Sequence, residues 1–139
     1  MLENILFTRT MAILEKGLDA ASMRNRVIAN NLANIDTPGY KRSEVVFEDE
    51  LKKAIGKNGG IRGFITNEKH IPIGGTGFPD INPSQVVKHD TSMRNDGNNV
   101  DIDREMAALA KNTIMFEALS QEIKGEFEKI KTAIIEGGR

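Results

Sequence analysis

Apolar side chains recur in alternating steps of three and four along the first 36 residues of the chain. The positions are Phe7, Met11, Leu14, Leu18, Ala21, Asn25, Ile28, Leu32 and Ile35. This heptad spacing predicts an amphipathic helix that packs against another helix. Asn25 is the one polar residue in the series, and a buried amide at such a position penalises registers in which it finds no amide partner. We therefore expect Asn25 to set the alignment of this helix with its neighbour.

A second apolar stripe runs along the same predicted helix. It consists of Leu6, Ile13, Ala20 and Val27, each one residue before a position of the first series. The two stripes together are wider than the seam that a single partner helix covers. The sequence therefore predicts that several neighbours pack around this helix.

The end of the chain carries a second heptad series. Its positions are Ile102, Met106, Leu109, Thr113, Phe116, Ser120, Ile123, Phe127, Ile130 and Ile134. Asp101 or Asp103 is a suitable N-cap and Glu105 adds negative charge near the helix N-terminus, while Gly137 and Gly138 stop the helix. Each terminal helix is expected to be roughly 50 Å long at 1.5 Å per residue.

The sequence between the two predicted long helices differs from them in composition and pattern. Thr37–Tyr40 predicts a turn, because Pro38 disfavours helical geometry at Thr37 and Gly39 turns readily. A short helix is predicted from Ser43 to Ile55, with Phe47 and Leu51 on its apolar face and Gly56 beyond its end.

Residues 57–100 hold most of the glycines and three of the four prolines, which predicts loops and a few short strands, as at 61–65 and 71–73. The expected fold class is mainly α, with two long heptad helices forming a coiled coil or helical bundle around a loop-rich insertion. The expected divisions are an N-terminal helix at 1–36, an insertion at 37–100 and a C-terminal helix at 101–139. The two helical segments are expected to form one assembly domain.

Composition narrows the classes of function. The chain has 139 residues, enough for one domain, and its formal charge of -1 provides no field to collect nucleic acid or an anionic membrane. It has no cysteine, which excludes disulfides and thiolate metal sites. The longest uninterrupted apolar run near the start, Met11–Leu14, is far shorter than the roughly 20 residues of a membrane span, and no cleavable signal peptide is expected.

The sequence gives little support for a catalytic or metal-binding site. His70 and His89 lack a second ligand at helical spacing, and Gly74–Gly77 lacks the lysine and the helix that a phosphate loop needs. The run Asp96–Asp103 does not fit a calcium-binding loop and is better explained as a turn leading into a capped helix. We expect no enzyme activity, no metal and no cofactor.

The heptads alone leave two explanations open, a monomeric helical bundle and an assembling subunit. Two helices of about thirty residues cannot cover both N-terminal stripes, which favours contacts between subunits. A soluble adaptor or chaperone-like protein that binds a partner's helix is the alternative function.

The segment Ala29–Tyr40 resembles the signature of the flagellar rod and hook axial proteins. The matching residues are Asn30, Asn31, Leu32, Asn34, Thr37, Pro38, Gly39 and Tyr40. In an axial protein these asparagines can offer amide groups to neighbouring subunits, and Tyr40 can bury its ring while its hydroxyl bonds a partner. The alternative is a capped turn within one subunit.

The short chain and the segments Val86–Asp90, Asp96–Asp101 and Glu105–Ala107 are similar to proximal rod subunits of the bacterial flagellum. The resemblance implies a structural protein of cell motility, exported by the flagellar type III route and self-assembling in the basal-body rod across the periplasm. The implied partners are itself, other rod proteins, the adaptor protein at the rod base and the export gate. A sister proximal rod subunit shares the signature and the size.

Overall fold

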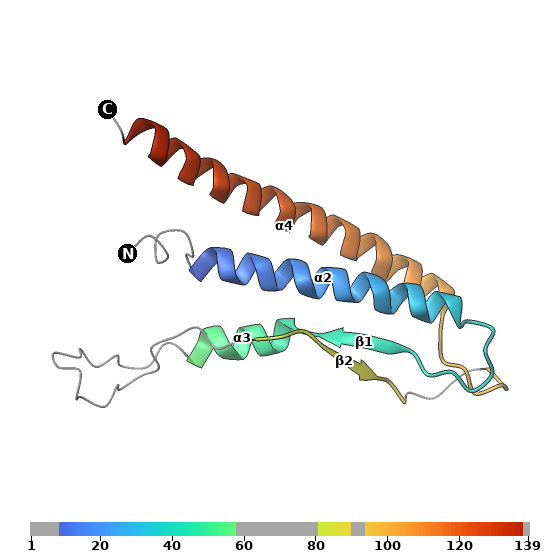
Figure 1. Ribbon diagram of the computed structural model, residues 1–139. Coiled ribbons are helices and arrows are strands. Elements are labelled where there is room, and N and C mark those ends of the chain that lie inside the picture. The colour runs from blue at the N-terminus through green and yellow to red at the C-terminus, as the bar shows by residue number, and fades with distance from the viewer. Residues whose placement is uncertain (1–8, 58–80, 90–93, 138–139) are drawn as a thin grey trace.

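The computed structural model describes residues 9–57, 81–89 and 94–137 (Figure 1). Its elements in chain order are helix α2 (Arg9–Ala33), strand β1 (Ser43–Val46), helix α3 (Glu48–Lys57), strand β2 (Ser84–Val87) and helix α4 (Ile102–Glu136). The predicted fold class is confirmed, because two long helices near the chain ends pack together and the smaller central part lies on one side of α2. No helix in the described ranges is long and apolar enough to cross a lipid bilayer.

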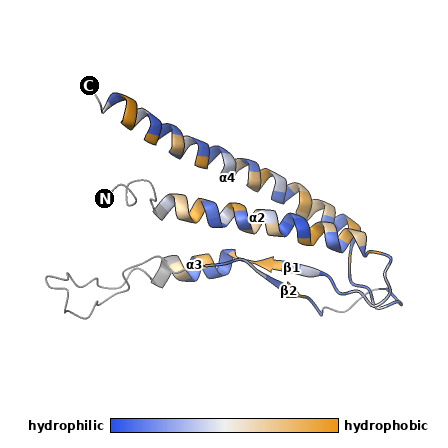
Figure 2. Ribbon diagram, viewed as in Figure 1, coloured by the Kyte–Doolittle hydropathy of each residue, from blue (hydrophilic) through white to orange (hydrophobic). Residues whose placement is uncertain are grey.

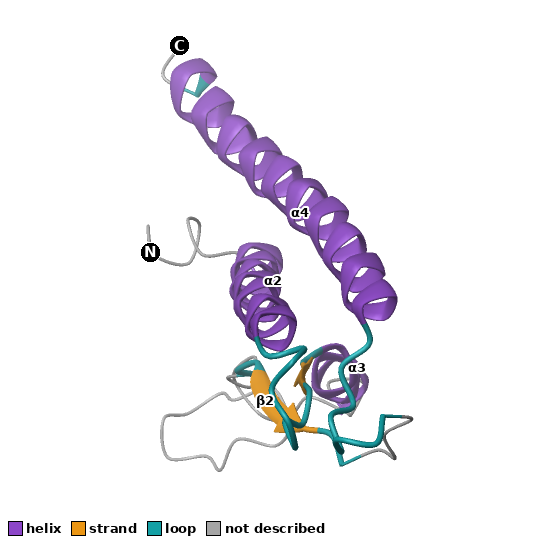
Figure 3. Cartoon of the chain, turned by 90° about the vertical axis from the view of Figure 1, so that its right-hand side faces the viewer, coloured by secondary structure: helices purple, strands orange, loops and turns teal. Residues whose placement is uncertain are grey.

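Helices α2 and α4 pack in antiparallel directions. Gly17 of α2 lies against Leu119 of α4, so close that a Cβ at Gly17 would stand 3.2 Å from a Leu119 methyl carbon. At the other end of the pair Asn31 contacts Glu105. Helix α4 has 35 residues, about 52 Å at 1.5 Å per residue, and in Figures 1 and 3 it diverges from α2 toward its C-terminus.

A second layer covers the side of α2 that α4 leaves open (Figure 3). Strands β1 and β2 pair antiparallel, with Ser43 opposite Val87, and α3 follows β1 directly. Ala20 of α2 is buried in one cluster with Phe47, Ala54 and Ile81. The expectation that the second stripe needs other subunits is therefore wrong for Ala20, whose neighbours come from its own chain.

The segment predicted as one helix from Ser43 to Ile55 divides into a strand and a helix. Ser43–Val46 forms β1, because alternate residues are buried and the β-branched valines suit a ladder with β2. Helix α3 begins at Glu48, where three acidic residues complement the positive end of the helix dipole. Gly56, expected beyond the helix, lies inside it.

The predicted end of the first helix is also shifted. Helix α2 ends at Ala33, and Ile35 N–H bonds the Leu32 carbonyl in a tighter turn, 3.3 Å away, before the Thr37–Tyr40 segment begins. The N-cap of α4 is Asp101, whose carboxylate accepts hydrogen bonds from the backbone N–H groups of Asp103 and Arg104. Phe7, Leu6, His70, Gly138 and the segments 61–65 and 71–73 lie outside the described residues.

Candidate assembly site

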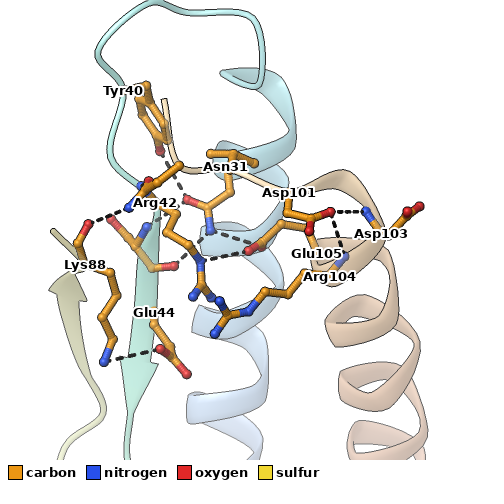
Figure 4. A network of polar contacts seen from close by, with 12 residues as sticks. Asn31, Tyr40, Arg42, Glu44, Lys88, Asp101, Asp103, Arg104 and Glu105 are labelled. Atoms are coloured by element: carbon orange, nitrogen blue, oxygen red, sulfur yellow. Dashed lines mark hydrogen bonds and ion pairs between the residues drawn. The ribbon is translucent and has the colours of Figure 1, made fainter. Parts of the chain in front are cut away.

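The amide of Asn31 joins three elements at the loop end of the helix pair (Figure 4). Its Nδ2 donates to the Ser43 carbonyl at 2.9 Å and to Glu105 Oε2 at 3.0 Å. Its Oδ1 accepts from Ser43 N–H at 2.9 Å and from the Tyr40 hydroxyl at 3.3 Å. Both donors and both acceptor positions of the amide are thus used inside one subunit, and Asn31 is completely buried.

Glu105 and Arg42 form a buried ion pair beside Asn31. Arg42 Nε donates to Glu105 Oε1 at 3.2 Å, and the two side chains are 7% and 1% exposed. Burial of an ion pair carries a large desolvation cost, which additional hydrogen bonds offset. Asn31 supplies one of these to the carboxylate, whereas Arg42 Nη1 is buried without a hydrogen-bond partner.

Two asparagines before α4 tie the ends of the other elements together. Asn98 Nδ2 lies 2.9 Å from each of the carbonyl oxygens of Asn34, Ile35 and Thr37, just beyond the end of α2. Asn99 Oδ1 accepts from Arg42 N–H and its Nδ2 donates to the Lys88 carbonyl, so that its amide lies between the two strands. The approach to α4 therefore adds hydrogen bonds to carbonyls of the turn after α2, two of which, those of Asn34 and Thr37, also accept backbone N–H groups within the turn.

The remaining signature residues shape that turn. Asn34 Nδ2 donates to the Asn30 carbonyl, and Thr37 Oγ1 bonds Asn34 Oδ1. Gly39 has a positive φ of 73° and donates its N–H to the Asp96 carbonyl at 2.8 Å.

The signature amides were expected to bond neighbouring subunits. For Asn31 and the Tyr40 hydroxyl this is wrong, because both bond within the chain. Their contacts agree with the alternative explanation, a capped turn within one subunit. Asn30 and Pro38 are exposed, and Leu32 is half-buried.

The predicted N-terminal seam is only partly buried in the subunit. Met11 and Ile28 are buried, Leu14 and Leu18 are half-buried, and Asn25 is exposed. Asn25 therefore does not lie in the contact between α2 and α4 of one chain, and its role in aligning α2 with a neighbouring subunit stays a prediction. Asn112, a residue not selected from the sequence, lies in that interface and donates from Nδ2 to the Ala21 carbonyl at 2.9 Å.

The face of α4 that meets α2 is rotated relative to the predicted seam. It follows Glu105, Asn112 and Leu119, one residue before Met106, Thr113 and Ser120. Glu105 and Asn112 are spaced seven residues apart, as in a heptad. A search for apolar repeats misses this face because both residues are polar.

The predicted seam positions of α4 differ in exposure. Met106, Phe116 and Phe127 are 50%, 44% and 55% exposed. Leu109, Ile123 and Ile130 are half-buried. Ile102 and Ile134 are exposed as well, so much of the second heptad series is exposed in the single chain. Figure 2 shows that hydrophobic residues recur along α4, including its C-terminal part, where it diverges from α2.

The structure does not bring the candidate catalytic and metal-binding residues together. His89 is exposed, and within the described ranges no group of three or more potential metal-binding side chains occurs. The Asp96 carboxylate accepts from Asn98 N–H at 3.1 Å, and this bond, together with Arg94, holds the pKa of Asp96 below its usual value. Asp96 thus belongs to the turn that the sequence predicts here.

Similarity to known proteins identifies the family of this chain. Residues 11–41 match the family model described as flagella basal body rod protein. The flagellar basal body rod protein FlgB of Bacillus subtilis is 40% identical over 134 residues, which cover 96% of this chain and 98% of that protein. The chain belongs to the flagellar basal body rod protein family. The FlgB proteins of Borreliella burgdorferi and Salmonella typhimurium are 36% and 32% identical, over 92% and 80% of this chain and 97% and 85% of their own lengths.

The rod-family match and the buried network overlap in one part of the fold. Residues 11–41 contain most of α2, the turn after it, and both Asn31 and Tyr40. Asn31 bonds Glu105 on α4, and Asn98 bonds backbone carbonyls of the turn, so these partners lie outside the matched segment. The rod-family signature therefore folds against a part of the chain that is 64 to 74 residues further along.

Proposed function

We propose that this rod-family chain is a structural subunit of the proximal rod of the flagellar basal body. It polymerises through its terminal helices, which act as one assembly domain, and forms part of the torque-transmitting shaft and of the export channel inside it. The similarity to FlgB proteins over nearly the whole chain supports this role.

The exposed apolar face of α4 is the observation that carries the proposal. Ile102, Met106, Phe116, Phe127 and Ile134 all belong to the second heptad series, with other members of that series between some of them, and each is 44–70% exposed. A row of large apolar side chains on a helix is stable in water mainly when another surface covers it. Neighbouring copies of the chain and other rod proteins provide that surface in a rod.

The expected partners and route follow from this role. The adaptor protein at the rod base binds the membrane-proximal end of the polymer, and the flagellar export gate passes the subunit. The chain performs no chemistry of its own, and it functions in the rod within the periplasmic space.

Removal of the gene and its replacement by variants test the proposal. Cells without the chain should lack hooks and filaments, and the wild-type chain should co-purify with detergent-extracted basal bodies. Leu32→Asp places a charge on a half-buried apolar position of α2 and should block assembly. Normal rods in cells that lack the chain would contradict a structural role.

A further inference from the structure

A groove of about 530 Å³ lies between α2, β1 and α4. Val27 and Ile28 of α2, Val45 of β1, and Ala108 and Met115 of α4 contribute apolar lining. Figure 4 shows its upper end, where Arg42 and Glu105 meet between the strand and α4. The volume is within the range of pockets that hold a ligand.

Two residues that line the groove each hold a buried polar atom without a hydrogen-bond partner, Arg42 Nη1 and Asn112 Oδ1. Each atom has less than 1 Å² of exposed surface, so both lie beneath the lining of the groove. They therefore place no demand on the polar groups of an occupant.

The groove carries no net formal charge. Four basic and four acidic side chains line it. Six of these eight residues form ion pairs, namely Arg24 with Glu48, Arg42 with Glu105, and Lys88 with Glu44. This balance favours an uncharged occupant over a phosphate, a nucleotide or an anionic lipid headgroup.

The edge of β1 points to an extended peptide. Arg42 pairs with Lys88 across the ladder, so the backbone groups of Ser43 and Val45 point away from β2. Asn31 already bonds the N–H and carbonyl of Ser43, so an added strand would meet the outward backbone groups of Val45 alone. No other described strand pairs with this edge of β1, and Val45 lines the groove. An extended chain placed there adds to the sheet by β-augmentation.

We propose that this groove binds an extended, uncharged segment of a neighbouring copy of the chain. The proposal rests on the proposed function, because a segment of one copy in a groove of the next is a heterologous contact, which generates an open helical polymer when the rotation between copies does not close into a ring. The chain contains an uncharged run of suitable composition at Ile71–Pro79, outside the described residues.

Photo-crosslinking from the groove tests the contact. A benzophenone amino acid replaces Ala108, with Phe127 as a second probe position on the exposed face of α4, in cells that express the full chain. Mixed light and 15N-labelled copies distinguish crosslinks between chains from those within one. In extracted basal bodies, we expect the probe at 108 to join the uncharged run of another copy.

The outcomes separate this contact from the proposed function. Crosslinks between copies from position 127 but none from 108 would overturn the groove contact and leave the rod role intact. Crosslinks from 108 only to another rod protein, or only within one chain, would also overturn it. If extracted basal bodies contain no copy of the chain, and neither probe forms a crosslink for that reason, the rod role itself is contradicted.

A matched pair of variants provides the second test. Ala108→Tyr fills the groove without removing a polar contact, whereas Ala107→Tyr places the same ring on an exposed position that does not line it. We expect Ala108→Tyr to reduce incorporation into rods at least ten-fold relative to Ala107→Tyr, with circular dichroism of both subunits unchanged. Equal incorporation of the two folded variants would overturn the proposal.

Discussion

Asn31 on α2 donates a hydrogen bond to the buried Glu105 carboxylate on α4, with 3.0 Å between Nδ2 and Oε2. The same amide also bonds both backbone groups of Ser43. One side chain thereby connects the helix pair to the strand, and the rod-family signature supports the fold of the single subunit before any contact with a neighbour.

Asn31→Ala should lower the free energy of unfolding by about 3 kcal/mol, because it leaves buried groups of Ser43 and Glu105 unpaired. Chemical denaturation of the purified chain measures the loss. Asn30→Ala is the matched control, since Asn30 is exposed and an exposed substitution usually changes stability by less than about 0.5 kcal/mol. Equal effects at the two positions would show that the buried network contributes little.

Glu105→Gln should destabilise the chain by about 3–5 kcal/mol, because it leaves the Arg42 charge buried without its carboxylate. A double-mutant cycle with Arg42→Gln isolates the pair. The double variant should be more stable than the sum of the two single losses predicts, by about 1–3 kcal/mol. Additive losses would mean that the two charges do not stabilise each other.

Gly39→Ala and Gly125→Ala should have opposite effects. A Cβ meets nothing within 4 Å at either position, but Gly39 has a φ of +73° and Gly125 lies within α4. The left-handed conformation costs a non-glycine residue about 1–2 kcal/mol, whereas alanine stabilises a helix interior by about 1 kcal/mol relative to glycine. Thermal unfolding should show a lower Tm for the first variant and a higher Tm for the second.

The turn at Asp96 should weaken in acid. Its folded pKa is lowered from 3.8, mainly by the hydrogen bond from Asn98 N–H. The stabilisation is therefore present above the unfolded pKa and is lost as pH falls through the folded value. A carboxyl NMR titration should place Asp96 below 3.8, and Asp96→Asn should remove this part of the pH dependence. A pKa at or above the usual value would contradict the turn geometry.

Phe127→Asp should abolish rod assembly while the subunit still folds. Phe127 is 55% exposed in the single chain, so its replacement removes little internal packing, and stability should change by no more than about 0.5 kcal/mol. Thr132→Asp introduces the same charge at another exposed position of α4 and is the control. Motility and basal-body extraction measure assembly. If both variants assemble normally, this face of α4 is not a contact between subunits.

Local patterns determined much of this protein. The heptad series predicted both long helices, and Asp101 was one of two proposed caps because its side chain acts on the next few residues. The turn at Thr37–Tyr40 was predictable for the same reason, since Pro38 and Gly39 restrict their own backbone. The signature at Asn30–Tyr40 also indicated the family to which the chain belongs.

Tertiary structure alone decided which positions face one another. Ser43–Val46 is a strand because β2, some forty residues later, pairs with it. Asn31, Glu105 and Asn112 lie inside because each finds polar partners on another element, and such partners are invisible to a search for apolar repeats. Asn25 has the spacing of a buried position and is nevertheless exposed, since the rotation of a helix depends on the shapes and hydrogen bonds of the surfaces it meets.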